Sequence, residues 1–532
     1  MASMRKTVIL LFAFLMACGL TRPLAVRDCS THENPVLLEK KSKYLEQKAE
    51  KRTDAPDIIW IIVDDLGMAD TDLYGEGTVH TPHLNKLADA GVRFENAYVT
   101  ASVCSPSRAA MLTGRYNQRY GFEHQLHDRY LKNKLEYFFF QYLIHSQPWY
   151  VQKQDTVPAG ECLASMGLPD SEITMAEVLK KYGYATGLFG KWHLTMQNID
   201  GPNAFGFDEF YGFLNSNSLY ARKGNQDIIC TRNKKDWTDK YIWKDGRSGL
   251  SAIQRNGEDI AEDRYLTTAI TDEAIHFIET SEQPYFALLT YNAPHTPFQA
   301  TAEAYAKYAD IKDPVKRTYA AMISTLDDEI GRLVDYLKST NRFDHTLIFF
   351  ISDNGGAEYT LATDNGPYKG GKITDFEGGL KVPMVMTWPA EVEPGVRFTP
   401  CVSSLDIFQT ILNAVTTDVP PMDLDGVNLF PSIQTDRPVH DYLYFRKGYN
   451  HSIRSADYKL TWNTQTGDTL MYHIQIDPYE NINIYGREAH AEMEAMFHAY
   501  SAWEQKLVSP RWPALIDFRY EDEDKHVYWF EN

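Results

Sequence analysis

Short apolar runs alternate with amphipathic stretches from residue 57 onward. The runs are typical of buried strands and stand at residues 58–63, 184–189, 285–291, 346–351 and 382–388. Segments with helical spacing lie between them, at residues 83–91, 174–183 and 315–337. Strands that alternate with helices predict an α/β fold, in which a large, mostly parallel sheet is flanked by helices.

The local composition of the sequence changes near residues 415–440, where prolines and aspartates cluster. Beyond this point, short alternating runs at 458–462 and 470–476 predict a small antiparallel sheet, and residues 489–507 predict a helix. We therefore expect a main domain over 55–437 and a smaller C-terminal α+β subdomain over 438–532. With 532 residues, the chain is long enough for two cores.

The first 19 residues have the features of a signal peptide. Arg5 and Lys6 precede an apolar run over residues 8–16, which is too short to span a bilayer. Residues 15–18 (LMAC) resemble a bacterial lipobox, which would leave Cys18 lipidated. Cleavage after Gly19 would instead release a soluble protein. We expect an exported protein, either periplasmic, a lipoprotein of the outer membrane or cell surface, or secreted, with a charged linker over 20–54.

Charge and cysteine content exclude several classes of partner. A formal net charge of −19 argues against nucleic acid and against an anionic membrane surface, so we expect membrane contact only through an N-terminal lipid anchor. No two cysteines form a CxxC pair, which argues against a thiolate zinc site. Without Cys18 an odd number of cysteines remains. Cys104 is the expected unpaired thiol, and a pairing of Cys162 with Cys230 is left open.

Acidic pairs follow two of the predicted strands. Asp64 and Asp65 end the first, and Asp353 and Asn354 follow the fourth. A single such pair more often caps a helix. Because the carboxyl ends of parallel strands share one edge, however, the two pairs are expected to meet. Carboxylates in one cleft repel each other, and oxygen ligands favour Ca²⁺ or Mg²⁺ over zinc.

Basic groups follow other strands of the same sheet. Lys191 and His193 end the second, and His295 follows the third in a loop held by two prolines. Lys372 lies in a glycine-rich loop before the last predicted strand. Each of them alone is more often an ordinary surface or core residue. Together they supply general acid–base groups and a positive site that suits a small tetrahedral oxyanion.

A series of motifs in order resembles the sulfatase family, which has an alkaline phosphatase-like fold. CSPSRAAMLTGR (104–115) is similar to the family's first signature at every fixed position, and GYATGLFGKWHL (183–194) resembles the second. IIVDDLG, NAPHTP, SDNGG, GGKITDFEGGLKVP and DPYENIN are similar to further blocks in the same order. The resemblance covers residues 58–484 and implies that 55–437 is a sulfatase catalytic domain.

The resemblance implies that the nucleophile is a modified amino acid, formed from a cysteine after translation. A maturation enzyme would oxidise Cys104 to Cα-formylglycine, whose hydrate offers one hydroxyl to attack sulfur and another whose deprotonation expels sulfate. A plain thiolate would leave an S-sulfonated enzyme. The implied metal ligands are Asp64, Asp65, Asp353, Asn354 and the modified Cys104, with Ca²⁺ as the usual ion.

Roles for the remaining residues are implied in the same way. Arg108 would position the hydrate, Lys191 and Lys372 would bind sulfate oxygens, His295 would bind substrate and protonate the leaving alcohol, and His193 would assist the hydrate. The expected substrate is a sulfated carbohydrate or polysaccharide.

Two functions other than a sulfatase are consistent with the sequence. One is a phosphodiesterase or phosphonate monoester hydrolase of the same superfamily. The other is a non-catalytic carbohydrate-binding homologue, which should show damaged site residues.

The aromatic stretch 124–152 matches no block of the family. It is predicted to be either an insertion packed on the domain or a wall of the substrate pocket.

Overall fold

The computed structural model describes residues 22–27, 35–75, 77, 79–127, 129–143, 148–158, 163, 165–196, 201–234, 236, 238–419 and 422–532. The predicted signal peptide, with Cys18, lies outside these ranges, as do Cys29 and Cys162. Cys104, Cys230 and Cys401 carry free thiols. Among the described residues, no helix has the length and apolar character needed to cross a bilayer.

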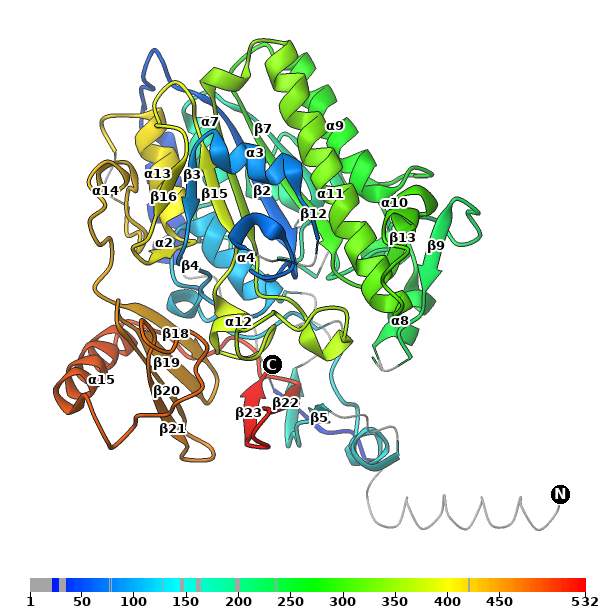
Figure 1. Ribbon diagram of the computed structural model, residues 1–532, viewed down its shortest axis with the longest axis vertical. Coiled ribbons are helices and arrows are strands. Elements are labelled where there is room, and N and C mark those ends of the chain that lie inside the picture. Colours follow the sequence, from blue (N-terminus) through cyan, green and yellow to red (C-terminus); the bar gives the residue numbers. More distant parts are fainter. Residues whose placement is uncertain are drawn as a thin grey trace.

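A ten-stranded mixed sheet forms the centre of the molecule (Figure 1). Its strands, in spatial order, are β11 (Glu258–Asp259), β10 (Gln254–Arg255), β8 (Glu209–Phe213), β7 (Ala185–Lys191), β12 (Tyr285–Pro294), β2 (Asp57–Asp64), β14 (Thr346–Ser352), β15 (Met384–Thr387), β3 (Val92–Phe94) and β16 (Val396–Phe398). The five from β8 to β14 run parallel, whereas β15 is antiparallel to β14. The predicted mostly parallel α/β sheet is confirmed.

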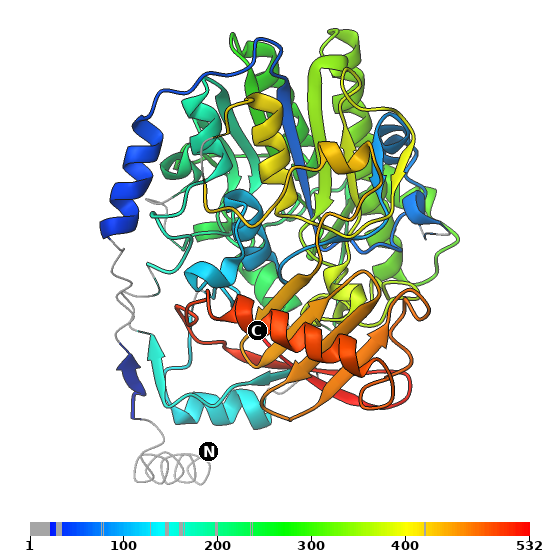
Figure 2. The same cartoon turned by 90° about the vertical axis from the view of Figure 1, so that its left-hand side faces the viewer.

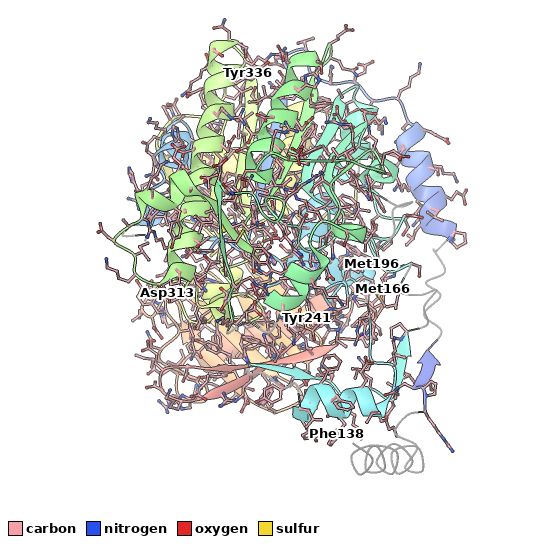
Figure 3. All side chains as sticks on the ribbon, turned by 90° about the vertical axis from the view of Figure 1, so that its right-hand side faces the viewer. Phe138, Met166, Met196, Tyr241, Asp313 and Tyr336 are labelled. Carbon is pink, nitrogen blue, oxygen red and sulfur yellow. The ribbon has the colours of Figure 1, made fainter. Side chains whose placement is uncertain are left out.

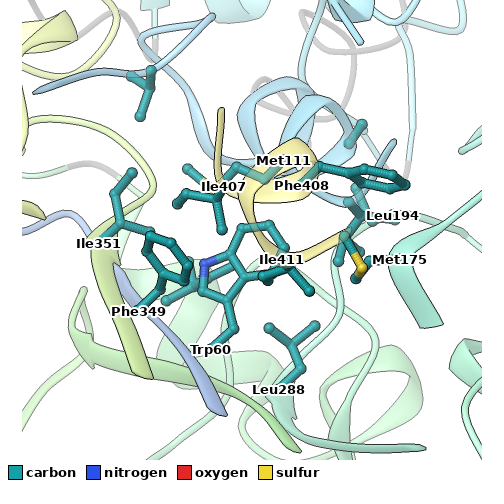
Figure 4. Close-up of a cluster of buried hydrophobic side chains, with 14 of the residues drawn as sticks. Trp60, Met111, Met175, Leu194, Leu288, Phe349, Ile351, Ile407, Phe408 and Ile411 are labelled. Atoms are coloured by element: carbon teal, nitrogen blue, oxygen red, sulfur yellow. The ribbon is translucent and has the colours of Figure 1, made fainter. Parts of the chain in front are cut away.

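Helices cover both faces of this sheet because its strands are apolar on both sides. Along β2, Trp60 packs into one core and Ile59 and Ile61 into the other, as expected for side chains that alternate between faces. The Trp60 side includes Met111, Phe349 and Ile411 (Figure 4). The helices on that side are α4 (Cys104–Thr113), α7 (Met175–Lys181) and α13 (Asp406–Val415), and those on the other are α3 (Pro82–Asp89), α9 (Leu266–Thr280) and α11 (Pro314–Ser339).

Two smaller sheets lie below the main one, orange and red in Figure 2. The first is the predicted antiparallel sheet, made of β18 (Leu443–Lys447), β19 (Asn450–Arg454), β20 (Tyr458–Asn463) and β21 (Thr469–His473), with α15 (His490–Glu504) packed against it. The second joins β22 (Ile516–Glu521) and β23 (Val527–Glu531) to β5 (Trp149–Val151). The C-terminal region therefore shares a sheet with a segment of the main domain.

Short elements complete the described chain. The paired strands are β1 (Ala25–Arg27) with β6 (Thr156–Pro158), β13 (Phe298–Thr301) with β9 (Ile228–Thr231), and β17 (Val402–Ser403) with β4 (Ala97–Tyr98). The short helices are α5 (Lys134–Phe138), α8 (Asp239–Asp245), α10 (Ala302–Lys307), α12 (Glu377–Leu380) and α14 (Phe430–Ile433). Within the expected linker 20–54, α2 (Pro35–Glu46) packs against α7, and its Lys41 pairs with Glu177 at 2.6 Å.

A buried charge cluster fastens the C-terminal sheet to the main domain. Lys459 on β20 donates to Glu377 at 3.1 Å and pairs with Glu480 at 3.0 Å, and all three side chains are buried. Glu480 also accepts a hydrogen bond from the backbone N–H of Glu377 at 2.6 Å. The single ammonium group of Lys459 contacts two carboxylates, so Glu377 and Glu480 repel each other when both are ionised. Protonation of either carboxylate relieves this repulsion. Burial, opposed by Lys459 and reinforced by Glu377, raises the pKa of Glu480 to about 7.

We predict that Glu480→Gln flattens the pH dependence of stability. In the folded protein Glu480 holds its proton up to about pH 7, whereas an unfolded Glu loses it near about 4.3. The folded state therefore binds more protons in this window, and the wild type loses stability as pH rises through it, by at most about 1.4 kcal/mol per pH unit. Urea-unfolding midpoints between pH 5 and 8 measure this slope. The exposed Glu488→Gln variant should keep the wild-type slope, and an unchanged slope in Glu480→Gln would contradict the assignment.

Candidate active site

The predicted site residues gather at the carboxyl edge of the main sheet. β7, β12, β2 and β14 are neighbours, so Lys191, His295, Asp64 and Asp353, which stand at their carboxyl ends or just beyond, reach the same place. Lys372 precedes β15, and it reaches this edge because β15 runs in the opposite direction. The backbone is strained here, since Asp65 and His193 have left-handed φ angles of 63° and 56°.

Cys104 begins α4 at the centre of this group and is fully buried. Its Sγ lies 3.3 Å from Asp64 Oδ1 and 3.7 Å from Asp65 Oδ1, and it accepts a hydrogen bond from Lys372 Nζ at 3.1 Å. Burial, and next Asp353, raise the pKa of the thiol well above its ordinary value. In this arrangement Cys104 is a neutral thiol held among charged groups.

Three cations compensate the three carboxylates. The pairs are Lys191 with Asp64 at 2.7 Å, Lys372 with Asp65 at 2.7 Å, and Arg108 with Asp353 at 2.7 Å. All six side chains are at most 4% exposed, so burial alone would raise the carboxyl pKa values. Lys191 nevertheless lowers the pKa of Asp64, and Lys372 that of Asp65.

The histidines lie beside these pairs as neutral bases. His295 Nε2 is 3.6 Å from Asp65 Oδ2, while its Nδ1 lies 2.5 Å from the Thr296 carbonyl oxygen, an arrangement that fits an Nδ1–H donor. His193 is buried, and neither ring nitrogen has a hydrogen-bond partner. Burial lowers the pKa of both histidines, with Asp64 opposing the shift at His295 and Lys191 reinforcing it at His193. Both imidazoles are therefore favoured in the neutral form, in which one ring nitrogen of each is an acceptor for a proton.

The donor set of this site fits a divalent cation. Asp64, Asp65, Cys104 and His295 each offer a ligand atom, and these atoms lie within 4.8 Å of one another. Asn354 Nδ2 donates to Asp65 Oδ1 at 2.7 Å, and its buried Oδ1 has no hydrogen-bond partner. Asp353 is also close, because its Oδ1 accepts from the Asp65 N–H at 3.2 Å. Buried carboxylate and amide oxygens that lack hydrogen-bond donors are typical of a binding site for a hard cation such as Ca²⁺ or Mg²⁺.

Sequence reasoning missed several residues around the site. Lys447, from β18, donates to Ser102 Oγ and to the carbonyl oxygen of Ile373, next to Lys372. Tyr359 and Asp236 belong to segments linked to the Lys372 loop, because the Lys372 N–H donates to the Gly356 carbonyl oxygen at 2.9 Å and Asn233 Nδ2 donates to the Thr360 carbonyl oxygen at 2.6 Å. None of the three stands at the end of a predicted strand, so strand-end reasoning could not find them.

The aromatic stretch 124–152 divides into two parts. Trp149 is buried and packs on Tyr359 and Phe518, with ring centroids 4.8 and 5.1 Å away. Phe138 and Tyr142 are exposed by 44% and 64%, and Figure 3 shows Phe138 at the periphery. Among the described residues of the stretch, Trp149 therefore belongs to the surroundings of Tyr359, and Leu126 at the other end contacts the Cys104 helix, because its N–H donates to Ser105 Oγ at 3.2 Å.

Comparisons with known proteins agree with this geometry. The family model "Sulfatase" matches residues 56–417, and the model "N-sulphoglucosamine sulphohydrolase, C-terminal" matches residues 371–505. Human N-acetylgalactosamine-6-sulfatase is 31% identical over 463 residues, which cover 83% of this chain and 79% of the relative. The crystal structure of Ps i-CgsB in complex with k-i-k-neocarrahexaose is 30% identical, with a TM-score of 0.70 over 86% of this chain and 94% of that one. A structure of BT4656 in complex with D-glucosamine-2-N,6-O-disulfate, 17% identical with a TM-score of 0.61 over 85% of this chain and 98% of that one, shares the fold.

We predict that Lys447→Met destabilises the protein and impairs the Lys372 loop. The substitution keeps the volume but removes the two buried hydrogen bonds that Lys447 donates to Ser102 Oγ and to the Ile373 carbonyl oxygen. We expect a loss of about 1–3 kcal/mol in unfolding free energy, measured by the urea midpoint, together with lower turnover. Lys525→Met, at a lysine whose side chain is 78% exposed, is the control and should change neither quantity. A Lys447→Met midpoint equal to that of wild type would refute the anchoring role.

Proposed function

Because the chain belongs to the sulfatase family, whose members hydrolyse sulfate esters, we propose that its substrate is a sulfated carbohydrate and that its nucleophile is a formylglycine made from Cys104. The observation that carries the proposal is the position of Cys104. It lies at a helix N-terminus, in contact with Asp64 and Lys372 and surrounded by three buried cations. The formylglycine hydrate would supply the hydroxyl that attacks sulfur.

The basic residues of the site are suited to hold the sulfate group. Lys191, Lys372 and Arg108 converge on the carboxylates around Cys104, and Arg108 Nη2 is buried without a hydrogen-bond partner. Lys191 and Lys372 would bind sulfate oxygens and stabilise the charge that moves onto them during transfer, and Arg108 would position the hydrate. The set of Lys191, His193 and Lys372 favours a sulfate monoester over a phosphate diester. An aryl phosphate diester is therefore the comparison substrate for the alternative function.

The histidines would move the protons. With Nδ1–H directed to the Thr296 carbonyl, His295 presents Nε2 to the site. In its protonated form, which the carboxylates of Asp64 and Asp65 favour, it would give the Nε2 proton to the oxygen of the leaving alcohol as the sulfur–oxygen bond breaks. His193 is a neutral imidazole whose ring nitrogens have no hydrogen-bond partner, and it would accept the proton that the nucleophile group loses. General acid and base are thus two separate side chains.

The bound ion would be Ca²⁺, held by Asp64, Asp65, Asp353, Asn354 and the modified Cys104. It would supply positive charge that polarises a sulfate oxygen. Compensation of Asp64 and Asp65 by the ion would make the ammonium groups of Lys191 and Lys372 available to the substrate.

Carbohydrate as the substrate class rests on the relatives and on export. The human relative is an N-acetylgalactosamine-6-sulfatase, and the Ps i-CgsB structure holds k-i-k-neocarrahexaose. The signal-like residues 1–19 would bring the enzyme to the periplasm, to the outer membrane or cell surface as a lipoprotein, or outside the cell, where sulfated polysaccharides occur. Intact site residues argue against a non-catalytic binding protein.

We predict that Cys104 carries an aldehyde in protein produced with a competent maturation system, as measured by mass spectrometry of its peptide. Cys104→Ala should lower sulfate release from N-acetylgalactosamine 6-sulfate or k-i-k-neocarrahexaose by at least about 10⁴-fold, because it removes the nucleophile. Cys401→Ala, at another free cysteine, is the control and should stay active. An unmodified thiol in active protein would refute the mechanism, and faster hydrolysis of an aryl phosphate diester would favour the alternative.

We also predict that removal of the cation destabilises the fold. Chelation with EGTA should lower the thermal midpoint of the protein, because repulsion among the carboxylates is then opposed by the lysines and Arg108 alone. Added Ca²⁺ should restore the midpoint more effectively than Mg²⁺ does. Asp65→Asn should weaken this response, whereas identical wild-type midpoints with and without EGTA would contradict the site.

A further inference from the structure

Asp236 has a buried carboxylate oxygen without a partner. Its Oδ1 accepts hydrogen bonds from the Thr238 N–H at 2.9 Å and from Thr238 Oγ1 at 2.7 Å, which fix the carboxylate in place. Its Oδ2 is buried and has no hydrogen-bond partner, and the whole residue is 4% exposed. A buried acceptor without a donor destabilises the fold, and a hydrogen-bond donor on a ligand would remove this penalty.

The segment that carries this carboxylate is linked to the loop of Lys372. The Lys372 N–H donates to the Gly356 carbonyl oxygen at 2.9 Å, and Tyr359 follows three residues later. The segments of Asp236 and Tyr359 are tied together in turn, because Asn233 Nδ2 donates to the carbonyl oxygen of Thr360 at 2.6 Å. Asp236 and Tyr359 therefore belong to two joined segments that hydrogen bonds connect to the Lys372 loop.

Tyr359 is the outermost ring of an aromatic cluster. It lies edge-on to Trp149, with centroids 4.8 Å apart and an interplanar angle of 76°, and 6.0 Å from Phe518. Trp149 and Phe518 are buried beneath it, whereas Tyr359 is half-buried. The three rings come from β5, from the loop after β14 and from β22, so the rest of the fold supports the Tyr359 ring in one orientation.

The chemistry of this pair suits the sugar ring of a sulfate ester. An aromatic face packs against the C–H groups of a sugar, and an ionised carboxylate accepts hydrogen bonds but donates none. A carboxylate in a buried position also opposes a second negative charge beside it.

We propose that Tyr359 packs against the sugar ring that carries the scissile sulfate, and that Asp236 accepts a hydrogen bond from a free hydroxyl of that ring. This subsite rests on the proposed function, a sulfatase that acts on carbohydrate. It adds a specificity, because the enzyme would select a ring without sulfate at the position facing Asp236. A disulfated ring with its second sulfate at that position is a poor substrate.

The test compares Asp236→Asn with wild type on monosulfated monosaccharides and their disulfated counterparts, beginning with N-acetylgalactosamine 6-sulfate and N-acetylgalactosamine 4,6-disulfate. We expect KM for the monosulfated ring to rise by about tenfold or more, because an amide replaces a charged acceptor. The ratio of kcat/KM for the disulfated ring to that for the monosulfated ring should rise at least about fivefold, because the repulsion is gone. Inhibition by inorganic sulfate should stay within about twofold of wild type, since sulfate does not reach Asp236.

Two further variants separate binding from folding. Asp245→Asn removes the same charge from an exposed position on α8 and should match wild type in every readout. Tyr359→Leu should raise KM for the sugar without changing inhibition by inorganic sulfate.

Parallel losses of sugar and sulfate binding in both site variants would mean general damage to the site and would overturn the subsite. The subsite would also be overturned if Asp236→Asn changed neither KM for the monosulfated ring nor the ratio of kcat/KM between the disulfated and monosulfated rings. Wild-type protein that releases no sulfate from any ring of the panel would contradict the proposed function, and with it the subsite, before any variant is compared.

Discussion

The mutual repulsion of Asp64, Asp65 and Asp353 is the constraint that the rest of the structure must satisfy. Three carboxylates without solvent at one sheet edge are tolerable only because Lys191, Lys372 and Arg108 each approach one of them to 2.7 Å. These cations come from β7, from the loop before β15 and from α4. The strand order of the sheet, the reversed direction of β15 and the placement of α4 across the edge all serve to bring them together. The same balance of charge leaves the site ready for a divalent cation and an anionic substrate group.

Much of this arrangement was predictable because parallel strands deliver their carboxyl ends to one place. The apolar runs identified β2, β7, β12 and β14, and the polar residues after them identified the acids, Lys191 and the histidines. The glycine-rich loop before the last predicted strand identified Lys372, although the sequence carries no signal of the direction of β15. Lys447, Asp236 and Tyr359 were not predictable, because their positions depend on contacts between segments more than 70 residues apart, such as Lys447 with Ile373. The pairing of β5 with β22 depends on such a contact too.

The C-terminal sheet supports the residues of the site through hydrogen bonds. Through Lys447 it holds Ser102 and Ile373, the residue after Lys372, and through Lys459 it holds Glu377, five residues after Lys372. Glu480, in the DPYENIN block, completes this support with its bond to the Glu377 backbone. Residues far from sulfur can therefore set the position of a group that acts on it.

The complete burial of Cys104 bears on the order of events during biosynthesis. Asp353, Lys372 and the Lys447 anchor, which help to enclose it, are synthesised more than 240 residues later. The proposed conversion of this thiol to an aldehyde would require a maturation enzyme to reach the CSPSR segment, which is buried in the folded protein. That conversion would therefore have to precede folding, and molecules that fold first would keep the thiol.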